Sequence, residues 1–235
     1  MAIQLKQVIP WGRSFDEYRR MFDLSSADLS GRILGCADGP ASFNCEATQR
    51  GIRVTSCDPI YSFEKEEIQQ RVVACHDDMV EQVRQQQDGF VWTDFRSPQD
   101  LGRHRLEVMQ RFLADYEKGK AQGRYVTASL PALPFAADEF DLALVSHFLL
   151  LYSGHLDLEF HWESIVELVR VAKEARIFPL LTLARVRSPH LEPLMDRLKA
   201  GGYQAEIRRV PYEFQCGGNE MLVVRKITSS AYPYE

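Results

Sequence analysis

The sequence predicts an α/β fold built on a doubly wound, mostly parallel sheet of seven strands. Apolar runs of strand length alternate with amphipathic segments of helix length through most of the chain, and this alternation places helices on both faces of a parallel sheet. The run over 140–145 is apolar apart from Asp141, as expected for a central strand covered on both sides. Only a loop around 216–218 joins the last two expected strands, which indicates that the final strand is antiparallel.

The first half of the chain is expected to open with a capped helix. Ser14 can cap this helix, and Glu17, three residues later, completes a capping box. Pro40 fits the first position of the second helix, because the N–H that proline lacks would have no partner there, and Gly51 fits its end. In order, the expected elements are a helix over 14–24, a strand over 32–34, a helix over 40–50 and a strand over 52–57.

The second half resumes the alternation after a long helical stretch. Apolar residues at helical spacing predict one helix over 64–87 and another over 98–118. The remaining expected elements are strands over 124–128 and 140–145, a helix over 162–173, a strand over 177–183, a helix over 189–200 and strands over 203–210 and 221–225.

The length of 235 residues suits a single domain over 1–235. Within it we expect an N-terminal helical segment over 1–30 and a helical insertion over 62–123, after the second strand. A helical crossover needs only a dozen or more residues, so the insertion contains about two extra helices. It is either a lid or wall that shapes a substrate pocket at the carboxyl ends of the strands, or a peripheral decoration or dimer contact.

The composition argues against several partners. With a formal net charge of −5, nucleic acid is not expected as the main partner, although Arg103, His104 and Arg105 could form a local basic patch. No apolar signal core follows the N-terminus, and the apolar run over 142–152 is too short to span a membrane. A cytoplasmic protein is therefore expected. An odd count of five cysteines predicts buried thiols without disulfides.

The strongest chemical signal is the strand, loop and helix unit over 32–50. Small residues at Gly35, Ala37 and Gly39 allow a ligand to approach the backbone, and the following helix N-terminus offers free N–H groups. Asp58 stands nineteen residues after Gly39, at the end of the next strand. An acid in that place can accept hydrogen bonds from both ribose hydroxyls, so the unit predicts a nucleoside site.

Pro40 argues against a dinucleotide as the ligand of this site. A dinucleotide site needs Gly-x-Gly-x-x-Gly, whose third glycine allows close packing of helix on strand, and Pro40 occupies that place. The pattern Gly-x-Gly-x-Gly is instead matched by Gly35, Ala37 and Gly39 with one conservative change.

Four segments together resemble class I (Rossmann-like) S-adenosylmethionine-dependent methyltransferases. Gly35-Cys36-Ala37-Asp38-Gly39 is similar to their glycine-rich motif, and 54–59 to their acidic second strand. The segment 133–142 resembles their Leu-Pro-Phe-x-x-x-x-Phe-Asp segment, and 167–171 the helix before their fifth strand. The resemblance covers roughly 31–60 and 124–226. It implies S-adenosyl-L-methionine as cofactor, S-adenosyl-L-homocysteine as product and a small molecule as methyl acceptor.

The resemblance also implies a set of cofactor contacts. The leading segment would fold over the cofactor through Tyr18 and Arg13, with Arg13 holding the methionine carboxylate by two hydrogen bonds or lying on the surface. The other implied contacts are Gly35, Cys36, Ala37, Asp38 and Gly39 beneath the methionine part, Asp58 on the ribose, Pro59 and Ile60 beside the adenine, Ser129 and Leu130 at its edge, and Ser146 and His147 lining the cleft.

Two departures from the family pattern leave other functions open. Ile33 stands where the family usually has an acid near the cofactor's amino group, and 128–130 offers no acid for the adenine. One alternative is a non-catalytic protein that binds S-adenosylmethionine or serves as a partner subunit. Another is a nicotinamide-dependent oxidoreductase on the same type of sheet, against which Pro40 argues.

Methyl transfer is an in-line displacement that depends mainly on positioning. His147 is the candidate base if the acceptor must lose a proton early, or it only lines the pocket. No metal site is expected, because His155 and His161 are too far apart to share one helix face. Cys36 is interpreted as a packing residue, and Tyr61 and Tyr152 either line the substrate site or belong to the core.

Overall fold

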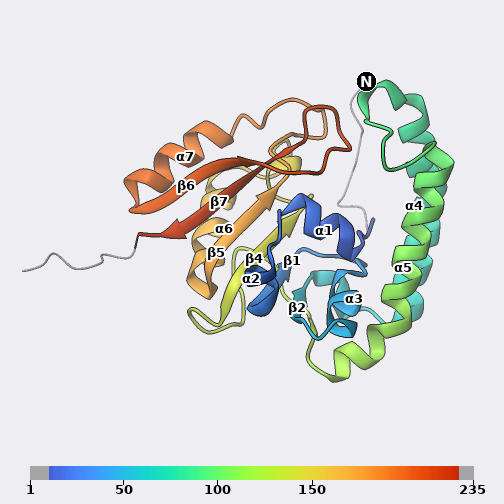
Figure 1. Cartoon of the computed structure of the whole chain (residues 1–235), viewed down its shortest axis with the longest axis horizontal. Coiled ribbons are helices and arrows are strands. Elements are labelled where there is room, and N and C mark those ends of the chain that lie inside the picture. Colours follow the sequence, from blue (N-terminus) through green and yellow to red (C-terminus); the bar gives the residue numbers. More distant parts are fainter. Residues whose placement is uncertain (1–10, 228–235) are drawn as a thin grey trace, which may run out of the picture.

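A computed structural model describes residues 11–227, in which seven strands form one sheet (Figure 1). The sheet order is β3-β2-β1-β4-β5-β7-β6. All neighbouring strands are parallel except β7, which is antiparallel to both β5 and β6. The predicted doubly wound, mostly parallel sheet with an antiparallel last strand is confirmed. The strands are β1 Arg32–Cys36, β2 Arg53–Cys57, β3 Tyr125–Val126, β4 Phe140–Ser146, β5 Ala172–Phe178, β6 Tyr203–Arg209 and β7 Glu220–Lys226.

The side chains of the central strands alternate between two apolar clusters. On β1, Ile33 belongs to a cluster with Tyr18 and Phe43, whereas its neighbour Leu34 belongs to a second cluster with Leu168. This is the period of two expected of a strand that is covered on both faces. The helices are α1 Phe15–Met21, α2 Ser26–Ser30, α3 Phe43–Gln49, α4 Lys65–Gln85, α5 Pro98–Ala121, α6 Leu158–Val171 and α7 Leu191–Ala200.

Helix α1 begins as the sequence predicts. The Ser14 side chain accepts from the Glu17 backbone N–H, and the Glu17 carboxylate accepts from the Ser14 backbone N–H at 2.9 Å, so both halves of the capping box are present. The first ten residues of the expected N-terminal segment lie outside the described residues. No helix within 11–227 is both long and apolar enough to cross a membrane.

The prediction that α3 begins at Pro40 is wrong. The helix begins at Phe43, and the Ser42 backbone N–H donates to the Arg13 carbonyl at 3.1 Å. The leading segment passes so close that a Cβ atom on Gly12 would lie 2.1 Å from the Pro40 carbonyl oxygen. Residues 39–42 therefore form a turn that holds the leading segment over the loop after β1.

The fifth strand also begins earlier than predicted, at Ala172 and not at 177. Charged side chains within this strand conceal the strand pattern. The structure pairs them: Lys173 lies 2.7 Å from Asp141, and Arg176 lies 2.8 Å from Asp28. The helix α6 runs directly into β5 at this point.

The insertion after β2 folds as a long pair of helices, α4 and α5, beside the sheet (Figure 1). Arg105 of α5 is 1% exposed and forms two hydrogen-bonded contacts of 2.7 Å with the carboxylate of Glu17, which is 2% exposed. The Tyr212 hydroxyl also donates to Glu17, at 3.1 Å. Arg105 therefore joins the insertion to α1, and the suggestion that 103–105 forms a basic patch is wrong.

Candidate functional site: a cleft at the reversal of strand order

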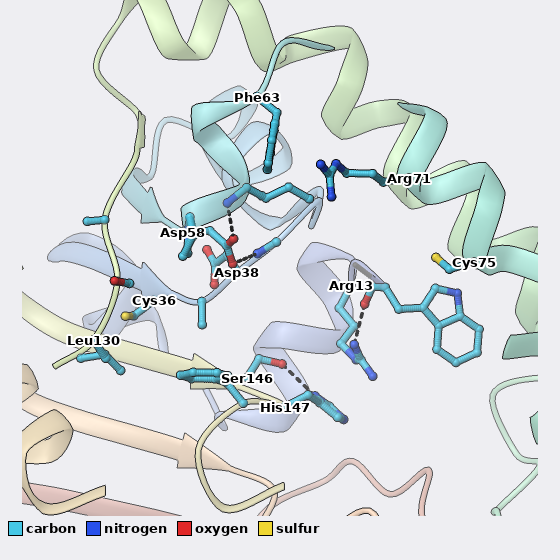
Figure 2. A pocket seen from close by; sticks show the side chains of 18 of the residues that line it. Arg13, Cys36, Asp38, Asp58, Phe63, Arg71, Cys75, Leu130, Ser146 and His147 are labelled. Atoms are coloured by element: carbon cyan, nitrogen blue, oxygen red, sulfur yellow. Dashed lines mark hydrogen bonds between the residues drawn. The ribbon is translucent and has the colours of Figure 1, made fainter. Parts of the chain in front are cut away.

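A cavity of about 640 Å³ lies at the carboxyl ends of β1, β2 and β4 (Figure 2). The strands β1 and β4 are neighbours, but the chain first runs outward from β1 to β2 and β3 and only then returns to β4. Successive connections thus leave the sheet in opposite directions at this point. Open α/β sheets bind their ligands in the crevice that this reversal creates.

The loop after β1 is held in a conformation that keeps its backbone open to the cavity. Ala37 and Gly39 have positive φ angles of 57° and 55°. The carboxylate of Asp58 accepts hydrogen bonds from the backbone N–H groups of Gly39 at 2.9 Å and Ile60 at 2.8 Å. Asp58 thereby ties the ends of β1 and β2 together at the mouth of the cavity, and burial raises its pKa.

Gly35 does not line the cavity, unlike the other residues of the glycine-rich loop. A Cβ atom at this position would lie 1.8 Å from Asp38 Oδ2. Only glycine therefore leaves room for the Asp38 carboxylate to turn back over β1. There it accepts hydrogen bonds from the Tyr18 hydroxyl at 2.7 Å and from the Ser56 hydroxyl at 2.6 Å.

Asp38 is an acid with an altered proton affinity. Burial, with a smaller contribution from the charge of Asp58, raises the pKa of Asp38 to about 7. The Tyr18 and Ser56 hydrogen bonds favour the charged form and oppose this shift. A carboxyl group in this balance can change its charge when a cation binds beside it.

The raised pKa of Asp38 predicts a pH dependence of stability. Its pKa of about 7 in the folded protein exceeds the ordinary aspartate value of 3.8. The stability that the neutral carboxyl contributes is therefore complete below pH 3.8 and is lost as the pH rises through about 7. From about pH 5 to about pH 7 the wild type should lose about 1–2 kcal/mol more free energy of unfolding than Asp38→Asn. Urea unfolding of both proteins across this pH range measures the difference. The same pH dependence of the free energy of unfolding in both proteins would contradict the prediction.

Ser146 ends β4 and His147 follows it, and both border the cavity opposite Asp58 (Figure 2). His147 has a positive φ of 54°, and its Nδ1 lies 2.8 Å from the Ser146 hydroxyl. Burial and the positive charges of Arg13 and Arg105 hold the pKa of His147 well below its usual range. The imidazole is therefore neutral near pH 7. A non-glycine residue with this backbone strain often marks a functional position.

Arg13 is the cation that faces this end of the cavity. Its Nη1 donates to the Trp11 carbonyl at 2.6 Å, and its Nε is buried with no hydrogen-bond partner. Within 11–227 no carboxylate lies in ion-pair distance of it, although the chain pairs Arg105 nearby with Glu17. Burial and the Arg105 charge lower the pKa of Arg13. An anionic group in the cavity would supply the missing partner.

Helix α4 supplies a wall of the cavity that sequence reasoning missed. The wall residues share one helix face with spacings of three, four and seven. The sequence signal for this wall is a second helix face with small and polar residues, beside the apolar stripe of the same helix. The α4 residues that line the cavity are Arg71, Ala74, Cys75, Asp78 and Gln82, and Arg71 lies over the Phe63 ring at 4.0 Å.

The structure brings almost all of the expected cofactor residues to one cavity. Those that line it are Arg13, Tyr18, Cys36, Ala37, Asp38, Gly39, Asp58, Pro59, Ile60, Ser129, Leu130, Ser146 and His147, whereas Gly35 lies beneath Asp38. Trp11, Phe63, Ala128 and Phe148 also line it and were not expected.

Several residues for which the sequence allows either a packing role or a role in a site are buried in the structure. Tyr61 and Tyr152 are both buried and belong to the apolar core, and the Tyr61 hydroxyl donates to the Gly39 carbonyl at 2.8 Å. Tyr152 also borders a second, smaller cavity. Cys36 is buried, and its contact with Cys57 and its burial raise its pKa, so it remains a thiol. His161 packs on His190 with ring centroids 4.9 Å apart. In the part of the chain that is described, no group of three or more His, Cys, Asp or Glu residues could hold a metal ion.

Comparisons with known proteins give a near relative. No family model matches the sequence. The chain is 36% identical over 225 residues to uncharacterized protein MJ0045 of Methanocaldococcus jannaschii, a match that covers 95% of this chain and 99% of that protein.

Solved structures resemble the chain only distantly. The PH0226 protein of Pyrococcus horikoshii has a TM-score of 0.44 and 12% identity, over 83% of this chain and 82% of that one. Magnesium protoporphyrin IX methyltransferase of Synechocystis, with bound S-adenosylhomocysteine, has a TM-score of 0.45 and 12% identity, over 86% of this chain and 77% of that one.

Proposed function

This chain belongs to the same family as uncharacterized protein MJ0045, and we propose that it is a class I S-adenosylmethionine-dependent methyltransferase acting on a small molecule. The observation that carries the proposal is the cavity at the reversal of strand order, where Asp58 holds the glycine-rich loop by its Gly39 N–H. A cleft with an acid at the end of its second strand suits the ribose of a nucleoside. Pro40 in place of a third glycine argues against a dinucleotide.

The residues in the cavity fit an S-adenosyl amino acid. Asp58 would accept from the ribose hydroxyls, since each carboxylate oxygen keeps a lone pair after its backbone hydrogen bond. Ile60 and Leu130, which both line the cavity, would flank the adenine. The buried, unpartnered Arg13 Nε fits the methionine carboxylate. Asp38, held by Tyr18, would face the amino group and take the place of the acid that is missing at position 33.

S-adenosylmethionine would supply an electrophilic methyl group at a sulfonium centre. The chain's contribution is to hold the donor and the acceptor in line and to exclude water. His147 is neutral near pH 7 and borders the cavity at the end of β4, so its imidazole can receive a proton from the acceptor. The insertion over 62–123 would form the wall of the acceptor's side of the cleft through α4. A cytoplasmic location also belongs to this proposal.

Calorimetric titration of the full chain tests the proposal. S-adenosylmethionine and S-adenosylhomocysteine should bind with one site per chain, and NAD should give no heat of binding. The proposal would be contradicted if NAD bound and the two sulfur nucleosides did not, or if none of the three ligands bound.

The assignment of Arg13 predicts a selective loss of affinity. Arg13→Gln should weaken S-adenosylhomocysteine binding by roughly tenfold or more, because charge-assisted hydrogen bonds to its carboxylate are removed. Binding of 5′-methylthioadenosine, which has no carboxylate, should stay unchanged. Arg19→Gln on the exposed face of α1 is the matched control, since Arg19 forms only a surface pair with Asp16. Equal losses for both nucleosides would show that Arg13 does not hold the carboxylate.

A further inference from the structure

A second, smaller cavity opens beside the main one and shares Trp11, Arg13 and His147 with it. Its volume is about 80 Å³. The remaining walls come from segments far apart in the sequence: the end of α4, Phe90, residues after β4, Leu183, and the connection between β6 and β7. A group on the far side of His147 from the glycine-rich loop would therefore lie in this cavity.

The walls of this cavity are apolar and aromatic. Phe90 and Phe214 stack with ring centroids 4.7 Å apart, and Met79, Val83 and Leu151 complete the apolar surface. Arg13 is the one charged side chain of this lining. In the function proposed above, Arg13 pairs with the carboxylate of the methyl donor in the main cavity. What remains is a small, mainly apolar space without a free charge, which favours an uncharged group.

Two further polar atoms of this lining are buried without a hydrogen-bond partner, the Trp11 Nε1 and the Gln215 Oε1. An unpartnered buried donor or acceptor is costly, so a ligand that pairs with these two atoms would be stabilised. Their positions are fixed by other contacts. The Trp11 carbonyl accepts from Arg13 at 2.6 Å, and Arg105 lies 5.6 Å from the Trp11 ring centre. Gln215 pairs with Phe90 through a β-bridge.

We propose that this cavity is the inner end of the methyl-acceptor subsite, and that the acceptor is an uncharged aromatic ring compound with one hydrogen-bond donor and one acceptor, whose polar edge enters this cavity while the rest of the ring lies in the main cavity. The Trp11 N–H donates to the ring compound, and the Gln215 amide oxygen accepts from it. This inference rests on the proposed function, since it places the acceptor relative to the methyl donor.

In the transfer, a lone pair on an oxygen or nitrogen of the acceptor forms the new bond to the methyl carbon. The electron pair of the broken carbon–sulfur bond returns to the sulfur, which becomes the neutral thioether of S-adenosylhomocysteine. The acceptor's proton passes to the His147 imidazole and from there to water. His147 borders both cavities and can serve this step from its observed position.

Three probes with one ring system test the subsite. 4-Quinolone is neutral and carries an N–H donor and a carbonyl acceptor, 4-methylquinoline lacks the donor, and quinoline-4-carboxylate is an anion. Their affinities are measured by ligand-observed NMR on the full chain loaded with S-adenosylhomocysteine. We expect 4-quinolone to bind at least about tenfold more tightly than the other two, as one satisfied buried hydrogen bond provides.

Gln215→Leu and Trp11→Phe should each remove most of that preference, whereas Gln204→Leu, an exposed substitution on β6, should leave it intact. Calorimetry with S-adenosylhomocysteine on the same samples shows that each variant is folded. Tighter binding of the carboxylate, no binding of 4-quinolone, or unchanged binding in both variants would overturn the inference. If S-adenosylhomocysteine binds the wild type in those cases, the proposed function stands and only the subsite fails; if it does not bind, both fail.

Discussion

Replacing Arg105 by methionine is expected to lower the free energy of unfolding by about 3–5 kcal/mol, because the substitution leaves the Glu17 carboxylate buried without its cation. Arg105 holds Glu17 by two contacts of 2.7 Å between α5 and α1. The other groups that hydrogen-bond Glu17 are Ser14, the Tyr212 hydroxyl at 3.1 Å and His104 at 3.3 Å, and they cannot neutralise it fully. Urea unfolding at neutral pH measures the loss.

Arg103 provides a matched control on the same helix. Its side chain is 70% exposed and pairs only with Asp100 at the surface, so Arg103→Met should change the free energy of unfolding by less than about 1 kcal/mol. The double variant Glu17→Leu with Arg105→Met should recover much of the lost stability, because it leaves no unpaired charge. Similar effects of Arg103→Met and Arg105→Met would contradict this account of the insertion.

The same pair has a pH signature. Burial alone would raise the pKa of Glu17, but Arg105 and the hydrogen bonds from His104 and Arg105 outweigh it and hold the pKa well below its usual range. A depressed acid contributes stability above its unfolded pKa, and that stability is lost as pH falls through the folded value. The wild type should therefore lose stability as the solution is acidified below about pH 4.5, and Arg105→Met should lack that dependence.

Gly35→Ala is expected to weaken S-adenosylhomocysteine binding by about ten- to a hundredfold and to destabilise the fold by about 1–3 kcal/mol. The added methyl group would lie 1.8 Å from Asp38 Oδ2. Either Asp38 must leave its hydrogen bonds with Tyr18 and Ser56 or β1 must shift, and both change the floor of the cavity. Calorimetry and urea unfolding measure the two effects.

Gly154→Ala is the control for this substitution. No heavy atom lies within 4 Å of a Cβ atom at Gly154 and its φ is not positive, so the change should stay within about 0.5 kcal/mol. Adding Asp38→Ala to Gly35→Ala removes the clash. Stability should then recover while nucleoside binding stays weak. A Gly35→Ala protein that binds S-adenosylhomocysteine like the wild type would show that Asp38 has no part in the cleft.

The sheet could be predicted from sequence because its strands carry the patterns that strands of a covered sheet require. The run over Phe140–Ser146 is almost entirely buried, and the capping box at Ser14 forms as expected. The start of β5 was missed because Lys173 and Arg176 find their partners on segments distant in the chain, Asp141 and Asp28. Local pattern cannot reveal such pairs.

The candidate site was predictable where it follows strand ends, and not where it depends on packing between distant segments. The loop after β1 and Asp58 lie next to strands that the sequence reveals, so they could be placed at one edge of the sheet. The α4 wall, the pairing of Arg105 with Glu17 and the Gln215 position beside Phe90 all depend on how the insertion docks. Pro40 misled the helix prediction because the leading segment occupies the space of the first turn.

A crystal structure of the full chain with S-adenosylhomocysteine tests the central claim most directly. The account predicts the ribose hydroxyls within hydrogen-bond distance of Asp58, the adenine between Ile60 and Leu130, the carboxylate on Arg13 and the sulfur facing His147. A nucleoside bound away from Asp58, or in the reverse orientation with its adenine beside His147, would contradict it.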